Sequence, residues 1–389
     1  MTDTSSNPVA KGRRRQLGID VFNEAVNRMV KLYERGDRII VSFSAGKDSG
    51  VCLEICVLAA TITDRLPVEV IMRDEEIMFP GTYEYAERVA SRPEINMHWI
   101  YARQPIINAF NRKNPYWWVF DPLLDESEWM RTPPDFAIEI PDKSIENMIT
   151  PKYFPVKEGQ TLTSVIGLRI SESFARRRGL YSSKGYLTKP DRHGVPHARP
   201  IYDFEDGDIW KSVLDNDWDY NKAYDVMHRH GVKAGGMRIG PPTMSIHGAD
   251  NLTMARTAWP SWFDKLEKRC PGVRTVAQFG KRAVTARRQL GETWQDTFWR
   301  ECVEEAPDWI AERAQKEAEK CLRQHSRHAT TPFPEAKACN QCSPPNQSWK
   351  KLVQNMYLGD PFGSASSQKT IEPEFFRPGA GTWGGKPTW

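Results

Sequence analysis

The sequence predicts an α/β protein built on a doubly wound, mainly parallel sheet, with a long insertion and a helical C-terminal region. Three observations support this prediction. Short β-branched runs alternate with amphipathic helical stretches in the first half of the chain, a rhythm typical of parallel sheets with right-handed crossovers. A loop of small polar residues, 44–49, joins the first strand to the next helix. The chain has 389 residues, too many for one small core, and its second half is rich in charged helix formers.

The elements are expected in a definite order along the chain. Apolar residues at helical spacing predict a helix over 17–33, and the run 38–43 predicts the first strand. A helix over 50–60, a strand over 68–72, a helix over 82–90 and strands over 98–101 and 163–167 follow, with further helices over 170–180 and 204–217. Residues 114–155 are rich in proline and contain Tyr116, Trp117 and Trp118. We expect an insertion without regular elements that covers a pocket, with these aromatics in its core or, alternatively, stacked on a base.

Composition narrows the class of protein. The chain is 39% hydrophobic and 27% charged with 14 tryptophans, which is typical of a globular protein. We find no apolar run long enough for a membrane span and no secretory signal, so a cytoplasmic location is expected. The 7 cysteines favour reduced thiols or metal ligands over a disulfide framework. A net charge of +4 is compatible with an anionic ligand or nucleic acid and requires neither.

The loop Ser44-Ala-Gly-Lys-Asp-Ser49 is the main candidate for a binding site. The first amides of a helix lack intrahelical partners and carry the positive end of its dipole, so this position suits an anion. Gly46 permits close backbone approach, Lys47 supplies a charge, and Asp48 is expected to cap the helix. The spacing of the glycines differs from that of P-loop kinases. An ordinary strand-to-helix turn is the alternative interpretation.

Three further segments lie where one site would need them. Asp74 and Glu75 follow the second strand and are expected to hold Mg²⁺ or a ribose, or to form a solvated acidic turn. Arg169 and Arg176 follow another strand end and can fork onto phosphate, although a solvated basic helix face is the alternative. The third segment runs from Arg199 through Asp203 to Trp210 and is a further candidate part of the site. The alternative interpretation is a strand that leads into a capped helix.

Together these segments resemble the phosphoadenosine-phosphosulfate (PAPS) reductase-like family of the PP-loop ATP-pyrophosphatase superfamily. The resemblance covers about residues 38–242. Residues 41–49 are similar to the family's Ser-Gly-Gly-Lys-Asp-Ser loop, with Ala45 in place of the first glycine. Residues 76–84 resemble its acidic, Phe-Pro-containing segment, and 167–176 its Gly-x-Arg-x-x-Glu-Ser-x-x-Arg element. Residues 200–224 resemble the segment that closes the pocket.

The resemblance implies a set of site residues and ligands. Lys47, Arg169 and Arg176 are expected to be catalytic, and Mg²⁺ is expected at Asp48 and Asp74. ATP or a PAPS-like nucleotide is the implied ligand. The residues expected to contact it are Ser42, Phe43, Ser44, Ala45, Gly46, Lys47, Asp48, Ser49, Asp74, Glu75, Gly167, Arg169, Glu172, Ser173 and Asp203.

Within this family, the chain most resembles the subgroup that contains immunoglobulin-binding regulator A and proteins of phage and mobile elements. The segments that carry this resemblance are 117–118, 131–134, 227 and 235–239. The chain departs from the reductases because it lacks their Glu-Cys-Gly tail, whose thiolate attacks sulfur. It also lacks cysteine in residues 236–240, where the iron–sulfur branch has a pair. Ordinary sulfonucleotide reduction is therefore not the expected reaction.

The later cysteines pose a separate question. Cys339 and Cys342 have the spacing of a metal knuckle, and Cys321, His325 and His328 precede them. Zn²⁺ or an iron–sulfur cluster at Cys321, Cys339 and Cys342, with a nearby histidine able to complete the site, is one interpretation, and Cys270 and Cys302 are alternative ligands. Unconnected thiols are the other interpretation. Cys52 and Cys56 are expected to be small buried hydrophobes.

The segments are expected to be a basic arm at 1–16, a nucleotide-binding α/β domain at 17–250 with its insertion at about 114–155, a helical region at 251–358 and an irregular tail at 359–389. The favoured function is ATP pyrophosphatase or adenylyl transfer to an acceptor, in nucleic-acid or sulfur metabolism. The alternatives are a sulfonucleotide reductase and a nucleotide-sensing regulator that acts with a partner such as a nucleic-acid-binding protein. The basic runs at 11–15 and 281–288 favour nucleic acid or are solvated faces. The sequence leaves the oligomeric state open.

Overall fold

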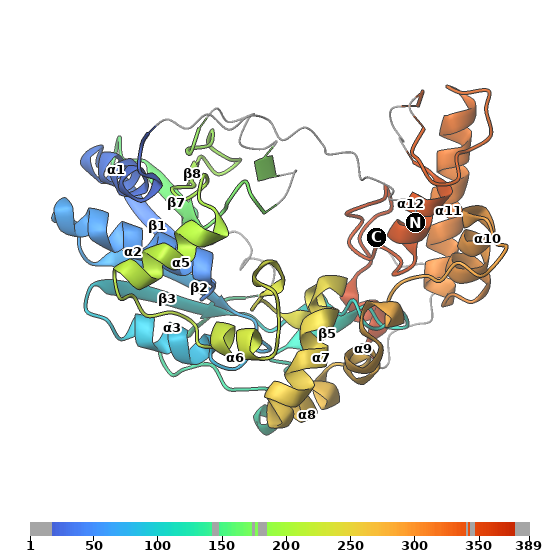
Figure 1. Cartoon of the computed structure of the whole chain (residues 1–389), viewed down its shortest axis with the longest axis horizontal. Coiled ribbons are helices and arrows are strands. Elements are labelled where there is room, and N and C mark those ends of the chain that lie inside the picture. Colours follow the sequence, from blue (N-terminus) through green and yellow to red (C-terminus); the bar gives the residue numbers. More distant parts are fainter. Residues whose placement is uncertain are drawn as a thin grey trace, which may run out of the picture. The chain divides into compact units, whose positions relative to one another are not determined.

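The computed structural model describes residues 18–141, 148–172, 176–177, 185–339, 341–342 and 347–377. It contains a six-stranded parallel sheet with the order β6-β3-β2-β1-β7-β8, of which β3, β2, β1, β7 and β8 are labelled in Figure 1. The strands are β1 (Arg38–Ser42), β2 (Val68–Asp74), β3 (Ile95–Tyr101), β6 (Ile138–Glu139), β7 (Leu162–Ile166) and β8 (His197–Ala198). The central strand β1 pairs with β2 and β7, and its Ile40 and Val41 are fully buried. The predicted α/β class is confirmed.

The chain divides into two compact units that interleave along the sequence. The first comprises Met1–Met72, Arg88–His98 and Asn147–Tyr220, and the second comprises Arg73–Glu87, Trp99–Glu146 and Asn221–Trp389.

Helices of the first unit pack on one another and on the sheet. These are α1 (Val21–Glu34), α2 (Lys47–Ile62) and α5 (Asp206–Asp215). The N-cap of α1 is Asp20, whose carboxylate accepts from the Asn23 amide at 2.8 Å. Helix α2 contacts β1 and β7 as well as both other helices. Most of its residues are buried, and Cys52 and Cys56 are fully buried in it, as predicted.

The second unit combines a hairpin with the C-terminal helices. Strands β4 (Gln104–Ile107) and β5 (Tyr116–Val119) pair in antiparallel fashion. The helices are α6 (Ala223–Arg229), α7 (Ala249–Ala258), α8 (Pro260–Arg269), α9 (Val273–Phe279), α10 (Trp294–Trp299), α11 (Asp308–Ser326) and α12 (Trp349–Met356), with a π-helical turn at η7 (Arg300–Glu304). Helix α3 (Thr82–Ala90) crosses from this unit into the first. Short 3-10 turns occur at η1 (Glu126–Glu128), η3 (Ala234–Gly236), η4 (Pro242–Met244), η5 (Ile246–Gly248), η6 (Gly280–Ala283) and η8 (Pro373–Phe376).

Two sequence predictions about the elements need correction. The insertion was expected to lack regular elements, but Tyr116–Val119 is a strand of the β4–β5 hairpin, because its aromatic and β-branched side chains suit a half-buried ladder. Tyr116 and Trp117 are buried, in line with the predicted core role. The helix expected from residue 170 does not start there: residues 170–172 form a turn, and Arg176 and Arg177 are helical.

Within the described residues, no helix combines the length and the apolar character that a membrane span needs.

Candidate phosphate-binding site

The loop after β1 delivers a helix N-terminus without a side-chain cap. Helix α2 begins at Lys47, three residues earlier than predicted, and its N-cap is Gly46, with extended φ and ψ of −87° and 160° and no capping side chain. Asp48 therefore lies inside the first turn, which corrects the expectation that it caps the helix. A helix start without a cap leaves amide hydrogens for a ligand, and the helix dipole favours an anion there.

Two serines brace this loop from within. The Ser44 and Ser49 hydroxyls lie 3.1 Å apart, and Ser49 Oγ donates to the Gly46 carbonyl at 3.0 Å. The Ser44 amide donates to Ser49 Oγ at 3.2 Å. Between them Ala45 has a φ of 54°, in the left-handed region that glycine tolerates best. This is the position where the resembling motif has glycine, so this chain keeps the bend with a residue that is strained in it.

The end of β7 presses directly on the first turn of α2. A Cβ added to Gly167 would lie 2.8 Å from the Ser49 amide nitrogen and 2.9 Å from the Asp48 carbonyl carbon. Real Cβ atoms do not approach backbone atoms so closely, so only glycine fits here without moving the loop. Gly167 therefore contributes to the site through packing.

Two buried cations meet two carboxylates beside the loop. Lys47 and Arg169 are 8% and 3% exposed. Arg169 Nε lies 2.5 Å from Asp48 Oδ1, and its Nη2 lies 2.7 Å from Asp206 Oδ1. Lys47 Nζ contacts the same two carboxylates at 3.0 and 3.1 Å. The structure thus brings together Lys47, Asp48 and Arg169, which sequence reasoning had placed in one site.

Asp206 is a residue of this cluster that the predicted site omitted. Burial acts to raise its pKa, but hydrogen bonds and charge from Arg169 and Lys47 outweigh burial and lower the pKa below the ordinary value of 3.8. Its side chain is 49% exposed, whereas that of Asp48 is 19% exposed. Its position in the first turn of α5 was visible in the sequence, but its direction toward Lys47 was not. At the N-terminus of the same helix, the Glu205 amide donates to the Asp208 carboxylate at 2.7 Å, as part of a capping box.

The other predicted residues of the second basic segment are arranged differently. The Glu172 carboxylate accepts from the Arg169 amide at 3.4 Å and also forms an ion pair with Arg176. The Arg176 side chain is 40% exposed. Ser173 lies outside the described residues.

Asp203, expected at the nucleotide, forms an ion pair with Arg28 on α1. Arg28 on α1 donates to both of its carboxylate oxygens at 2.9 and 2.7 Å, and also to the Pro200 carbonyl at 2.6 Å. The Arg28 guanidinium also lies over the Tyr202 ring, 4.6 Å from its centroid. This pair ties α1 to the chain ahead of α5. Sequence reasoning missed Arg28 because it looks like one more polar position of an amphipathic helix.

Asp74 and Glu75 belong to the second unit, where cationic and polar groups already engage them. Asp74 accepts from Trp99 Nε1 at 3.0 Å and from the Glu76 amide at 3.0 Å, and it pairs with Arg131. Glu75 pairs with Arg73. Both oxygens of the fully buried Asp74 therefore have partners within its own unit. The sequence could not reveal this, because Arg131 lies far along the chain.

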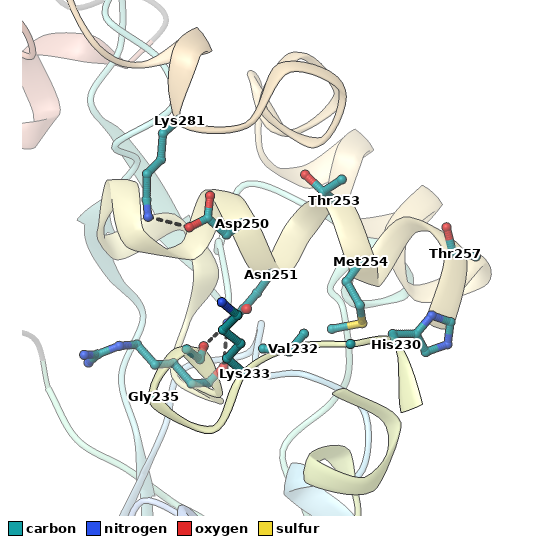
Figure 2. A pocket seen from close by; sticks show the side chains of 13 residues that line it. His230, Val232, Lys233, Gly235, Asp250, Asn251, Thr253, Met254, Thr257 and Lys281 are labelled. Carbon is teal, nitrogen blue, oxygen red and sulfur yellow. Dashed lines mark hydrogen bonds and ion pairs between the residues drawn. The ribbon is translucent and has the colours of Figure 1, made fainter. Parts of the chain in front are cut away.

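A separate open pocket of about 640 Å³ lies in the second unit. Figure 2 shows it between α7 and the segment with Lys233 and Gly235. Asn251 holds that segment by donating to the carbonyls of Gly236 and Arg238 at 3.3 and 3.2 Å. The exposed side chains of Lys233 and Arg238 give its rim a positive character.

Two of the C-terminal cysteines lie in a cluster with one of the histidines that precede them in sequence. His325, Cys339 and Cys342 place their ligand atoms within 4.8 Å of one another. Cys321 is outside this group, and its Sγ lies 3.6 Å from Glu317 Oε1. Of the residues that precede the knuckle in sequence, His325 therefore lies with the two knuckle cysteines and Cys321 does not.

Comparisons with known proteins extend these observations. Residues 38–230 match the phosphoadenosine phosphosulfate reductase domain. The chain is 25% identical over 248 residues to the uncharacterized protein YbdN of Escherichia coli (strain K12), an alignment that covers 58% of this chain and 59% of that protein. The chain therefore spans less than two thirds of this relative.

Solved structures are similar to the chain at low identity. An FMN adenylyltransferase from Candida glabrata, in complex with FMN and an ATP analogue, has a TM-score of 0.34 and 12% identity, and covers 52% of this chain and 58% of its own. A phosphoadenylyl-sulfate reductase from Candida auris, in a phosphate complex, has a TM-score of 0.31 and 14% identity, and covers 57% and 93%.

Proposed function

Because its residues 38–230 make this chain a member of the PAPS reductase-like family, we propose that it binds an adenine nucleotide at residues 44–49 and transfers the adenylyl group of ATP to an acceptor. The observation that carries the proposal is the pair of buried cations, Lys47 and Arg169, beside a helix start without a side-chain cap. Amide hydrogens and fixed positive charges in one place are what a polyphosphate needs. The family relationship supports adenine as the base.

In the proposed reaction, a nucleophilic oxygen of the acceptor attacks the α-phosphorus of ATP. The bond from the α-phosphorus to the bridging oxygen of the β-phosphate breaks, and pyrophosphate leaves. The loop amides, Lys47 and Arg169 stabilise the charge that develops on the leaving group. Lys47 and Arg169 are already buried beside the loop, so their positions need to change little as that charge forms.

Phosphate binding would also release carboxylates. Asp48 and Asp206 now neutralise Lys47 and Arg169, and a phosphate would take over that role. Mg²⁺ is commonly held by one or two carboxylates together with substrate phosphates, and the Asp48 and Asp206 carboxylates lie beside the loop that would hold those phosphates. Mg²⁺ would supply further charge neutralisation of the phosphates.

The acceptor is proposed to be anionic or nucleic acid. The positive rim at Lys233 and Arg238, together with the basic stretch at 281–288, supports this class. The basic run at 11–15, which also favoured it, lies outside the described residues. A cytoplasmic location is part of the same proposal.

The test is ATP binding and pyrophosphate release by the full chain and by Lys47→Met. Loss of one charge-assisted contact of about 1.5–3 kcal/mol should weaken ATP binding about 10- to 100-fold, measured by titration calorimetry. Lys211→Met is the matched control, because Lys211 is exposed and pairs only with Asp215 among the described contacts. Pyrophosphate release is then followed with single-stranded and duplex nucleic acid as acceptors.

Other outcomes separate the competing functions. Failure to bind ATP, together with tight binding of PAPS and production of sulfite, would contradict the proposal and favour a sulfonucleotide reductase. Binding of ATP without turnover, together with a stable partner complex, would favour a nucleotide-sensing regulator.

A further inference from the structure

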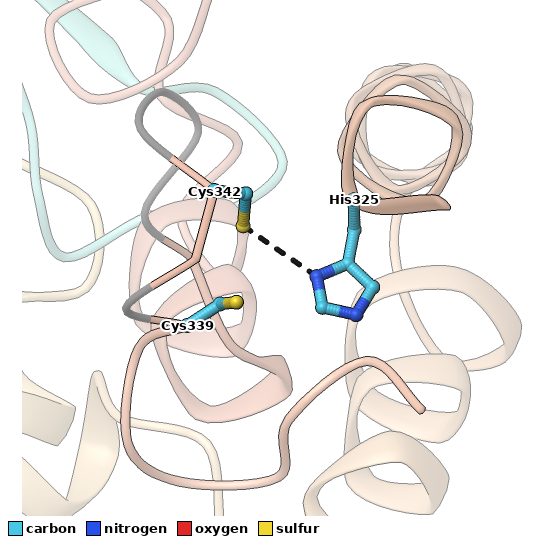
Figure 3. Close-up of side chains that lie close together, drawn as sticks. All are labelled: His325, Cys339 and Cys342. Carbon is cyan, nitrogen blue, oxygen red and sulfur yellow. Dashed lines mark hydrogen bonds between the residues drawn. The ribbon is translucent and has the colours of Figure 1, made fainter. Parts of the chain in front are cut away.

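Three metal-ligating side chains converge at the end of α11. His325 lies in the last turn of this helix, whereas Cys339 and Cys342 come from the segment that leads to α12 (Figure 3). All three residues are buried, with exposures of 4%, 9% and 0%. His325 is separated from the two cysteines by more than ten residues of sequence. Their meeting in one buried place is therefore a feature of the tertiary structure.

The tautomer of His325 can be deduced from its partners. Nε2 lies 2.8 Å from the Thr331 carbonyl oxygen, which only accepts hydrogen bonds, so Nε2 carries the proton. In the neutral ring Nδ1 then presents a lone pair, and Nδ1 faces Cys342 Sγ at 3.5 Å. A ring nitrogen held by a backbone carbonyl while the other faces the ligands is the usual arrangement of a metal-binding histidine.

The two cysteines have the local geometry of a metal knuckle. They are spaced Cys-x-x-Cys, and the Gln341 amide donates to Cys339 Sγ at 3.4 Å. A backbone amide directed at sulfur favours the thiolate, which is the form that binds metal. By sequence, residues 340, 341 and 343–346 contain no further cysteine, histidine or carboxylate.

The segment that carries the two cysteines would be stabilised by a link to α11. Residues 327–348 connect α11 to α12 without a helix or strand among the described positions. Hydrogen bonds hold the segment near its ends, from Trp349 N to the Pro334 carbonyl at 2.9 Å and from Cys339 N to the Gln347 carbonyl at 3.2 Å. Phe333 packs edge-on against His325 at 5.3 Å. Loops of this length without secondary structure of their own are uncommon in compact domains and are usually either functional or linker segments.

We propose that His325 Nδ1, Cys339 Sγ and Cys342 Sγ bind one Zn²⁺ ion that fastens this segment to α11. Two thiolates and an imidazole suit Zn²⁺, whereas an iron–sulfur cluster generally needs four cysteines. Three protein ligands leave the fourth position of a tetrahedral zinc site to a water molecule or a further group. This inference is independent of the proposed nucleotide chemistry, because every ligand lies in the second unit.

The experiment measures zinc in the purified full chain by mass spectrometry and zinc affinity by competition with a chelator. About one zinc per chain is expected. His325→Ala, Cys339→Ser and Cys342→Ser should each lower zinc affinity at least about tenfold, since each removes a ligand. His325→Cys, which replaces one ligand by another, should retain zinc and so distinguish loss of a ligand from loss of folding.

Three controls test the assignment. His328→Ala removes an exposed histidine three residues away, and Cys302→Ser removes a thiol from the neighbouring core. Both should retain zinc, as should Cys321→Ser. Absence of zinc from the wild-type chain, visible absorbance with acid-labile sulfide, or full zinc content in the three ligand variants would overturn the proposal. Zinc loss in Cys321→Ser comparable to that in Cys339→Ser would overturn the three-ligand assignment.

Discussion

At the scale of residues, the candidate site is a balanced cluster of two cations and two carboxylates. Lys47 and Arg169 are buried, but Asp206, which neutralises both, is half exposed. The cluster is therefore arranged so that one anion can be exchanged for another with little cost. A bound phosphate would compete with Asp206 for the same nitrogen atoms.

This competition leads to a prediction for Asp206→Asn. Removing the resident anion should strengthen binding of a metal-free nucleotide about two- to fivefold, because an exposed ion pair is worth up to about 1 kcal/mol. Titration calorimetry in the presence of a chelator measures the effect. Asp215→Asn, which breaks the exposed pair with Lys211, should leave affinity unchanged. Weaker binding by Asp206→Asn without Mg²⁺ would show that Asp206 does not compete with the ligand.

At the scale of elements, the position of the loop depends on contact between β7 and α2. Gly167 allows this contact because any side chain there would collide with the backbone of Asp48 and Ser49. The loop is also braced from within by Ser44 and Ser49. The first turn of α2 is thus held from two sides before any ligand binds.

We therefore predict that Gly167→Ala damages both stability and binding. Overpacking against backbone should cost about 1–3 kcal/mol of the free energy of unfolding, and displacement of the helix start should weaken nucleotide binding. Urea denaturation and titration calorimetry measure the two effects. Gly207→Ala is the control, since a Cβ there meets no atom within 4 Å and alanine suits a helix better. Equal behaviour of the two variants would contradict the packing argument.

At the scale of the whole molecule, two compact units carry different sites. The loop at 44–49 belongs to the first unit, and the His325–Cys339–Cys342 cluster belongs to the second. Each unit has its own buried side chains, including the C-terminal core around Phe298 and Trp349. A ligand stabilises the structure that binds it, by an amount set by its concentration relative to its Kd.

Scanning calorimetry should therefore separate the two sites. ATP at about 100 times its Kd should stabilise the transition of the first unit by about 2.7 kcal/mol. Removal of metal with a chelator should lower the transition of the second unit. The transitions are compared in phosphate-free buffer alone, with ATP, and with the chelator. One transition that responds equally to both agents would show that the units unfold together.

The sequence by itself determined the class of fold and the place of the loop. Alternating strand and helix periods are local patterns, so β1, α2, β2 and α3 were predicted within a few residues. The strand Tyr116–Val119 was missed because prolines nearby in the sequence hide its short strand pattern. Its pairing with β4 is seen only in the tertiary structure. The chemical types in the loop, above all Gly46 and Lys47 at a strand-to-helix junction, likewise follow from the chain alone.

Only the tertiary structure decided which charges meet. Arg169 and Asp206 reach Lys47 from distant elements, whereas Asp203 is taken by Arg28 and Asp74 by Arg131. His325 lies beside the knuckle cysteines, and Cys321 does not, for the same reason. A buried charge needs a partner, and the partner is selected by distance in space, which spacing along the chain does not encode.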